Sequence, residues 1–134
     1  MALKPASVLA SLTISGLTLG VFSAALTAGP DSVVRRFLEG VHRQDAASVQ
    51  RFVWQPIQSP SGSYILALAQ RVNSTGRRAQ ITRRESRGPY ILIVTRTERE
   101  GGGAFIDQWV LERRNATIRI NADLTATQGS IYTP

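Results

Sequence analysis

The chain has 134 residues, and 16 basic against nine acidic residues give it a formal net charge of +7. It has no cysteine, which excludes a disulfide framework, a thiolate metal site and a lipid-modified N-terminal cysteine. Its single histidine and scattered acidic residues predict no metal site, and no motif predicts a cofactor.

The first 30 residues form a segment of their own. Residues 6–28 are a continuous uncharged run that, as a helix, would reach about 35 Å, enough to cross a hydrocarbon core. Lys4 precedes the run, which places the N-terminus in the cytoplasm if the run is a retained anchor. The alternative is a signal peptide cleaved after Ala25 or Ala28. We expect a single-pass anchor over residues 1–30 and an extracytoplasmic domain over residues 31–134.

A strip of small residues runs along this predicted transmembrane helix. Gly16, Gly20 and Ala24 recur every four residues and would lie on one helix face. Such a strip allows a second helix to approach closely in lipid. The strip therefore predicts a helix-packing site, although glycine and alanine are also common in signal sequences.

Three helices are expected next. After Gly29-Pro30, Asp31 is placed to cap an amphipathic helix over Ser32 to about Arg43. Asp45 caps a shorter second helix that ends near Trp54. The segment 59–63 reads as a loop, and a third helix runs over residues 64–72 with Gly76 as its C-terminal cap.

The second half of the chain has the pattern of β-strands. Strands are expected over residues 77–86, 90–95, 105–112 and 117–120, separated by turns at Gly88-Pro89, at residues 101–103 and at 114–116. The segment 90–95 is apolar on both faces, which predicts a central strand. The tail from Ala122 is expected to be irregular. Helices followed by antiparallel strands indicate an α+β fold, with helices packed on a curved sheet.

The stretch DSVVRRFLEGVHRQDAASVQRFV, with its break at residues 44–47, resembles the first two helices of the nuclear-transport-factor-two-like (cystatin-like roll) superfamily. The segment FIDQWVLERRNATIRIN resembles the closing strands of the same superfamily, so that the resemblance covers roughly residues 31–123. It implies a bent sheet around a helix, with a cone-shaped cavity. Some members are isomerases or dehydratases and many are non-catalytic binding modules, so the resemblance leaves the function open.

Asp107 is the acidic residue best placed for catalysis. Strand alternation puts it on one face with Phe105, Trp109 and Leu111, where a carboxylate among apolar groups would suit a general base. The alternative is that it pairs with an arginine. His42, near the end of the first domain helix, fits a structural role at the helix terminus better than acid–base work. The candidate pocket combines these two with four aromatic residues: Phe37, Trp54, Tyr90 and Trp109.

Five arginines gather on one short arm of the sheet, at positions Arg77, Arg78, Arg83, Arg84 and Arg87. Neighbouring residues on a strand face opposite sides, so the five cannot all line one pocket. They form either a solvated edge that discourages aggregation or a docking surface for an acidic protein or lipid headgroups. An exported protein without a nucleic-acid motif gives no reason to expect nucleic acid as a partner.

These observations favour a non-enzymatic, single-pass accessory or assembly subunit of a larger membrane protein complex. Its expected partners are the membrane, protein subunits of that complex and, as a further candidate, anionic lipid. Two alternatives stay open: a secreted or periplasmic small-ligand binder, and an isomerase or dehydratase with Asp107 as base.

Overall fold

A computed structural model describes residues 29–128 and 130–133. The described residues form the following helices: α2 (Pro30–His42), α3 (Ala46–Arg51), α4 (Pro60–Ser74) and α5 (Ala122–Gln128). Their strands are β2 (Gln80–Arg87), β3 (Tyr90–Glu98), β4 (Ala104–Arg114), β5 (Thr117–Ile120) and β6 (Ser130–Thr133). The α+β class is therefore confirmed for this part of the chain.

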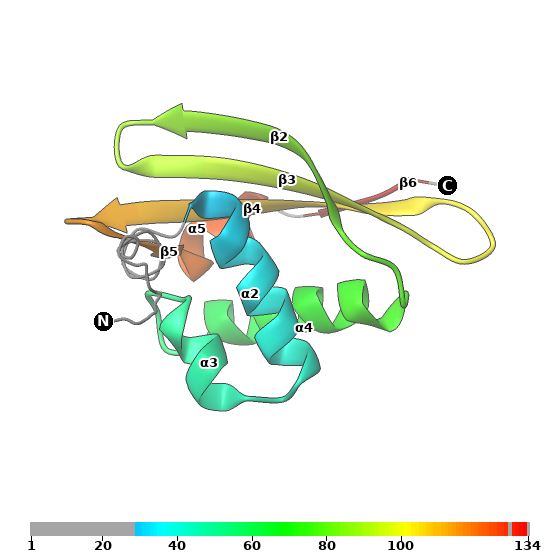
Figure 1. Ribbon diagram of the computed structural model, residues 1–134, viewed down its shortest axis with the longest axis horizontal. Helices are drawn as coiled ribbons and strands as arrows, with labels where there is room; N and C mark the ends of the chain where they lie inside the picture. The colour runs from blue at the N-terminus through cyan, green and yellow to red at the C-terminus, as the bar shows by residue number, and fades with distance from the viewer. Residues whose placement is uncertain (1–28, 129, 134) are drawn as a thin grey trace, which may run out of the picture. The chain divides into compact units, whose positions relative to one another are not determined.

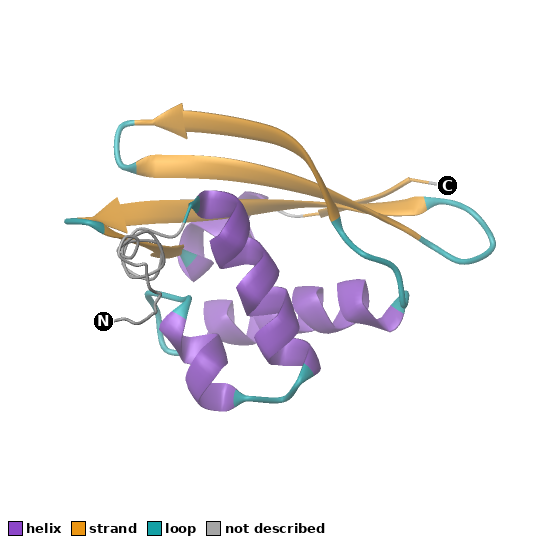
Figure 2. Cartoon of the chain, viewed as in Figure 1, coloured by secondary structure: helices purple, strands orange, loops and turns teal. Residues whose placement is uncertain are grey.

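The strands form one sheet in the order β2-β3-β4-β5, and β6 pairs with the first residues of β4. The β2–β3 and β3–β4 pairs are antiparallel, and β3 is central, as its two apolar faces predict. Helices α2, α3 and α4 lie on one face of this sheet, so helices form one layer and strands the other (Figures 1 and 2).

The core lies between these two layers. Helix α2 buries Val33, Val34, Phe37, Leu38 and Val41, the stripe that its helical spacing predicts. Register places two further buried side chains on the inner face of the sheet, because Ile93 of β3 is directly opposite Trp109 of β4. Phe37 meets Trp109 edge to face, with ring centroids 5.9 Å apart.

Helix α4 begins four residues before the start expected from the sequence. The segment 59–63, expected to be a loop, is the N-terminus of this helix, because the Ser59 side chain accepts a hydrogen bond from the Gly62 amide and Pro60 follows it. Gly62 is required there, since an added Cβ would stand 2.6 Å from the Cα of Ile57. Residues that resembled a loop in composition are thus a helix cap.

The tail is regular, where an irregular segment was expected. Helix α5 begins after Asn121, whose side chain accepts a hydrogen bond from the Leu124 amide. Thr125 is fully buried, and its hydroxyl accepts from the Val110 amide and donates to the Val110 carbonyl. A polar sequence is therefore ordered by hydrogen bonds to β4 that local patterning does not reveal.

Candidate functional site

The arginine-rich arm is β2 together with the residues that lead into it. In the strand order β2 is an outermost strand, and among the described strands it pairs with β3 alone. The five arginines predicted as a docking surface are all exposed. Their side chains divide between the two faces of the sheet, because Arg83 is opposite Val94 whereas Arg84 is opposite Ile93.

Two of the five arginines are already engaged. Arg83 forms an ion pair with Glu85 two residues further along the same strand. Arg84 reaches across to α2, where its Nε donates to both carboxylate oxygens of Asp31 at 2.8 and 3.0 Å. The other three, Arg77, Arg78 and Arg87, form no ion pair with another described residue. The arm therefore carries uncompensated positive charge.

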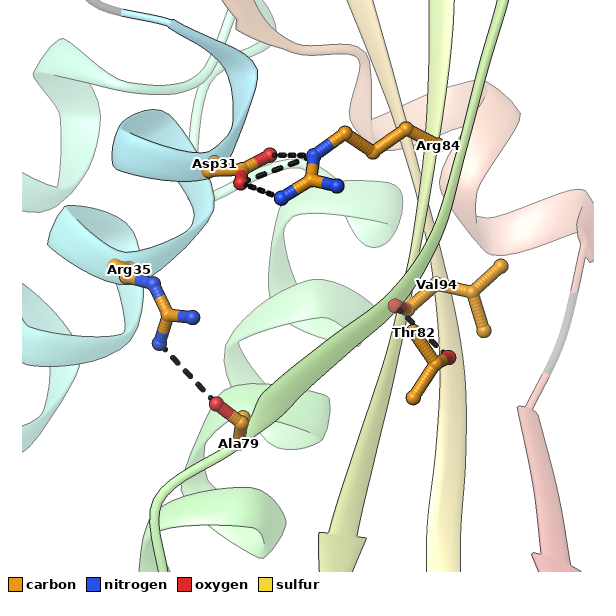
Figure 3. A network of polar contacts seen from close by, with 6 residues as sticks. All are labelled: Asp31, Arg35, Ala79, Thr82, Arg84 and Val94. Carbon is orange, nitrogen blue, oxygen red and sulfur yellow. Dashed lines mark hydrogen bonds and ion pairs between the residues drawn. The ribbon is translucent and has the colours of Figure 1, made fainter.

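Asp31 and Arg35 connect the first turns of α2 to β2 and to Ala79, the residue before β2 (Figure 3). One turn after Asp31, the Arg35 guanidinium donates to the Ala79 carbonyl at 3.2 Å. The hydrogen bond from Arg84 holds the pKa of Asp31 below its ordinary value; partial burial opposes it, and the charges of Arg84 and Arg35 lower the pKa further. Asp31 thus lies within the first turn of α2 and binds β2, where the sequence predicted only a cap.

This contact predicts a pH dependence of stability. A carboxyl group whose pKa is lowered by folding contributes stability above its unfolded pKa of 3.8, and that contribution is lost as the pH falls through the lower folded value. Asp31→Asn should therefore lower the urea midpoint modestly at neutral pH and reduce its fall between about pH 5 and about pH 2. The measurement is urea unfolding of the full chain in mild detergent, with Glu100→Gln as the control. An unchanged pH profile would contradict the role of this contact.

Asp107 lies on the inner face of the sheet, as strand alternation predicts, and its side chain is fully buried. The Arg71 guanidinium of α4 donates to its Oδ1 at 2.5 Å. Arg71 also stacks on Phe105, with its guanidinium carbon 4.2 Å from the ring centroid. The sequence left two alternatives open for this carboxylate: apolar surroundings or a pair with an arginine. The structure shows the pair with an arginine.

The six candidate pocket residues lie in different surroundings. Phe37 and Trp109 fill the core, and Asp107 lies two residues from Trp109 in an ion pair. His42 is exposed at the end of α2, and Tyr90 is 40% exposed on the outer part of the sheet. The Trp54 indole donates to the Glu112 carbonyl at 2.8 Å and its ring lies beneath Arg119. The structure thus separates the exposed His42 and Tyr90 from the buried Phe37, Asp107 and Trp109, and a pocket shared by all six residues stays a prediction.

The described part of the chain has shallow clefts near β2. A cleft of about 330 Å³ between α2, the end of α4 and the residues that lead into β2 contains two residues of the arginine arm, and its lining is Arg35, Leu38, Glu39, Val72, Asn73, Arg77, Arg78 and Ala79. A second, of about 280 Å³, is lined by Glu85, Arg87, Tyr90, Leu92, Val110 and Gln128. Both border the arginine arm. Sequence reasoning missed the contribution of Arg35, which spacing alone assigns to a solvent-facing position of its helix.

Two other kinds of feature are absent from the described residues. No three histidine, aspartate or glutamate side chains there are grouped so that they could hold a metal ion. None of the helices in that part of the chain is long and apolar enough to span a membrane. The apolar run of residues 6–28, with the predicted packing positions Gly16, Gly20 and Ala24, lies outside the described residues.

Comparison with known proteins adds no family to this description. No model of a known protein family matches the sequence, and no curated protein matches it significantly. The most distinctive group of residues in the described part of the chain is the arginine arm on β2 and the residues that lead into it.

Proposed function

We propose that the chain is a non-enzymatic accessory or assembly subunit of a membrane protein complex. In this proposal residues 1–30 anchor it in the bilayer, and the domain from residue 31 onward, related to the nuclear-transport-factor-two-like superfamily, docks partner subunits outside the cytoplasm. The observation that carries the proposal is the arm of exposed arginines on an outermost strand and on the residues that lead into it, three of which form no ion pair with another described residue.

The state of Asp107 supports a binding role over an enzymatic one. A general base must reach the proton that it removes, whereas the side chain of Asp107 is fully buried and bonded to Arg71. A small-ligand binder would need space around Phe37 and Trp109, which pack against each other. The exposed arginines, in contrast, can bind carboxylates of a partner without any rearrangement of the core.

Purification from the native membrane tests this proposal. The full chain is extracted in mild detergent, its intact mass is measured, and the chains that co-purify with it are identified. We expect a mass that begins at or near Met1 and partner chains in fixed proportion. A mass that begins after Ala25 or Ala28, with no partner chain, would contradict the anchored-subunit proposal.

Charge reversal separates the docking surface from charge in general. The triple variant Arg77→Glu, Arg78→Glu, Arg87→Glu should reduce co-purifying partner at least about tenfold, because like charges across an interface repel. The matched control reverses three other exposed arginines, Arg36, Arg51 and Arg113, and should retain the partner. Equal losses in both variants would mean that net charge, not this arm, determines binding.

The predicted anchor has its own test. Gly16→Leu with Gly20→Leu places branched side chains on the small-residue strip and should release the subunit from its complex while leaving it in the membrane. Unchanged co-purification would contradict helix packing through this strip and would leave the arginine arm as the remaining docking surface.

A further inference from the structure

The outermost position of β2 leaves part of its backbone without a partner strand in the described structure. In an antiparallel pair, alternate residues direct their N–H and C=O groups toward the neighbouring strand, and the others direct them away. The β2–β3 register shifts between Ile81 and Arg83, so the regular part of this edge is Arg83–Arg87. A segment of about five residues could therefore pair with it over about 17 Å.

The outer face of this short edge carries an alternating charge pattern. Arg83, Glu85 and Arg87 share the face that points away from the helices, since they are opposite Val94, Leu92 and Tyr90 of β3. Glu85 is held by Arg83, whereas Arg87 forms no ion pair with another described residue. The net charge of the three is positive, and the two positive positions are four residues apart.

The inner face of this edge carries no unbalanced charge in the described structure. Its charged residue is Arg84, which Asp31 already neutralises through a two-pronged contact. Ser86, opposite Ile91, is small and uncharged. A segment that paired with β2 would thus meet unbalanced charge on one face only.

We infer that β2 is a strand-addition edge that receives an extended acidic segment of a partner protein. This inference rests on the proposed docking function and specifies its chemistry. The segment carries Asp or Glu at two positions four residues apart, which meet Arg83 and Arg87, and an uncharged or basic residue midway, opposite Glu85. Backbone hydrogen bonds give affinity, and the spacing of the acids gives selectivity.

The competing interpretation is that these arginines keep the edge free. Charged side chains on an outermost strand commonly prevent unwanted pairing with other chains. The two interpretations differ in one respect that can be measured. A purely protective edge binds no strand, whereas a docking edge binds one with the correct alternation of acids and loses it when that alternation is broken.

The probe is a synthetic fluorescent peptide of about nine residues, built from threonine and valine with glutamates at its third and seventh positions. A control peptide of the same composition places the two glutamates next to each other, on opposite faces of a strand. Binding to the full chain in mild detergent is followed by fluorescence anisotropy, and protection of the β2 amides is followed by hydrogen exchange. We expect the first peptide to bind at least about tenfold more tightly than the second.

Backbone chemistry distinguishes strand addition from simple attraction between charges. N-methylation of alternate peptide residues should abolish binding for one alternating set and leave it for the other, because only one set bonds to β2. The variant Arg83→Glu with Arg87→Glu should lose the acidic peptide and bind its arginine-substituted counterpart. The matched variant Arg36→Glu with Arg113→Glu should behave as the parent chain.

Three results would overturn the inference: equal binding of both peptides, equal tolerance of both methylation patterns, or no binding of either peptide at millimolar concentration. These outcomes are separate from a failure of the proposed function. If the peptide binds but no partner chain co-purifies from membranes, the docking edge stands and the assembly role fails. If partners co-purify equally with the Arg83→Glu, Arg87→Glu variant, the assembly role stands and the strand-addition edge fails.

Discussion

Replacement of Arg71 by methionine is expected to destabilise the protein by about 3 kcal/mol, because it leaves a charged carboxylate in the core without its guanidinium partner. The Asp107 side chain has no solvent exposure, and that of Arg71 is 35% exposed. This partial exposure places the expected cost at the lower end of the range for broken buried pairs. Methionine retains most of the packing against Phe105. The loss of stability therefore measures the removal of the Arg71 charge and not a change in side-chain volume.

A double variant gives the decisive comparison. Arg71→Met with Asp107→Val removes both charges and puts a β-branched residue into the strand, and it should recover most of the stability lost in Arg71→Met alone. The measurement is urea unfolding followed by tryptophan fluorescence, with an unchanged dependence on urea as evidence that the fold is kept. If the double variant is as unstable as the single one, the pair contributes through packing, and its electrostatic interpretation is wrong.

The local patterns of the chain were sufficient to predict most of its elements. The apolar stripe of α2, the cap at Asp45 and the turn at Gly88 each depend on residues within one or two turns of each other, and each is present in the structure. Asp45, for example, accepts a hydrogen bond from the Ser48 amide at 3.2 Å. The outermost position of β2 and the central position of β3 also follow from composition, because β3 is apolar on both faces over residues 90–94, whereas β2 is rich in arginine.

The elements that were missed depend on distant parts of the chain. Helix α5 is held by Thr125 bonding to Val110 and by the Ala122 amide donating to Gln55, 67 residues away. These partners lie outside the segment 122–128 itself. Its polar residues, taken alone, therefore resemble an irregular tail. The early start of α4 is a different case, since Ser59 followed by Pro60 is a local cap signal in a stretch whose composition is typical of a loop.

In the candidate site, too, local features can be predicted from the sequence and contacts between distant residues cannot. Strand alternation correctly separates Arg83 from Arg84, but it cannot tell which arginine is neutralised. Asp31, the partner of Arg84, is 53 residues away, and Arg71, the partner of Asp107, is 36 residues away. Residue type and spacing thus identify where charge gathers, and only the tertiary fold decides how much of that charge is left for a partner.

Truncation of Trp109 to alanine should be the most damaging single change, at about 3–5 kcal/mol. Trp109 is fully buried, its ring packs edge to face on Phe37, and its indole nitrogen donates to the Thr95 hydroxyl at 2.9 Å. The alanine variant loses apolar contacts, opens a cavity and leaves a buried hydroxyl without this donor. Because native domains have only about 5–15 kcal/mol of stability, this variant is close to the limit of folding.

Trp109→Phe keeps the prediction testable if the alanine variant does not fold. It preserves an aromatic ring against Phe37 but removes the donor to Thr95, and it should cost about 1–3 kcal/mol. The comparison is Trp54→Phe, which also removes an indole hydrogen bond but at a half-buried position, and which should cost less. Equal costs at the two positions would contradict the assignment of Trp109 to the centre of the core.

The two predicted effects should not be independent. Thr95, which accepts the indole hydrogen bond of Trp109, is directly opposite Asp107 in the β3–β4 register, so the tryptophan and the ion pair share a neighbour. Changes at contacting sites commonly couple by about 0.5–3 kcal/mol. The combined variant Arg71→Met with Trp109→Phe should therefore depart from the sum of its parts, because relaxation around one site gives the other room to adjust. Strict additivity would mean that the core and the ion pair are separate structures that merely adjoin on β4.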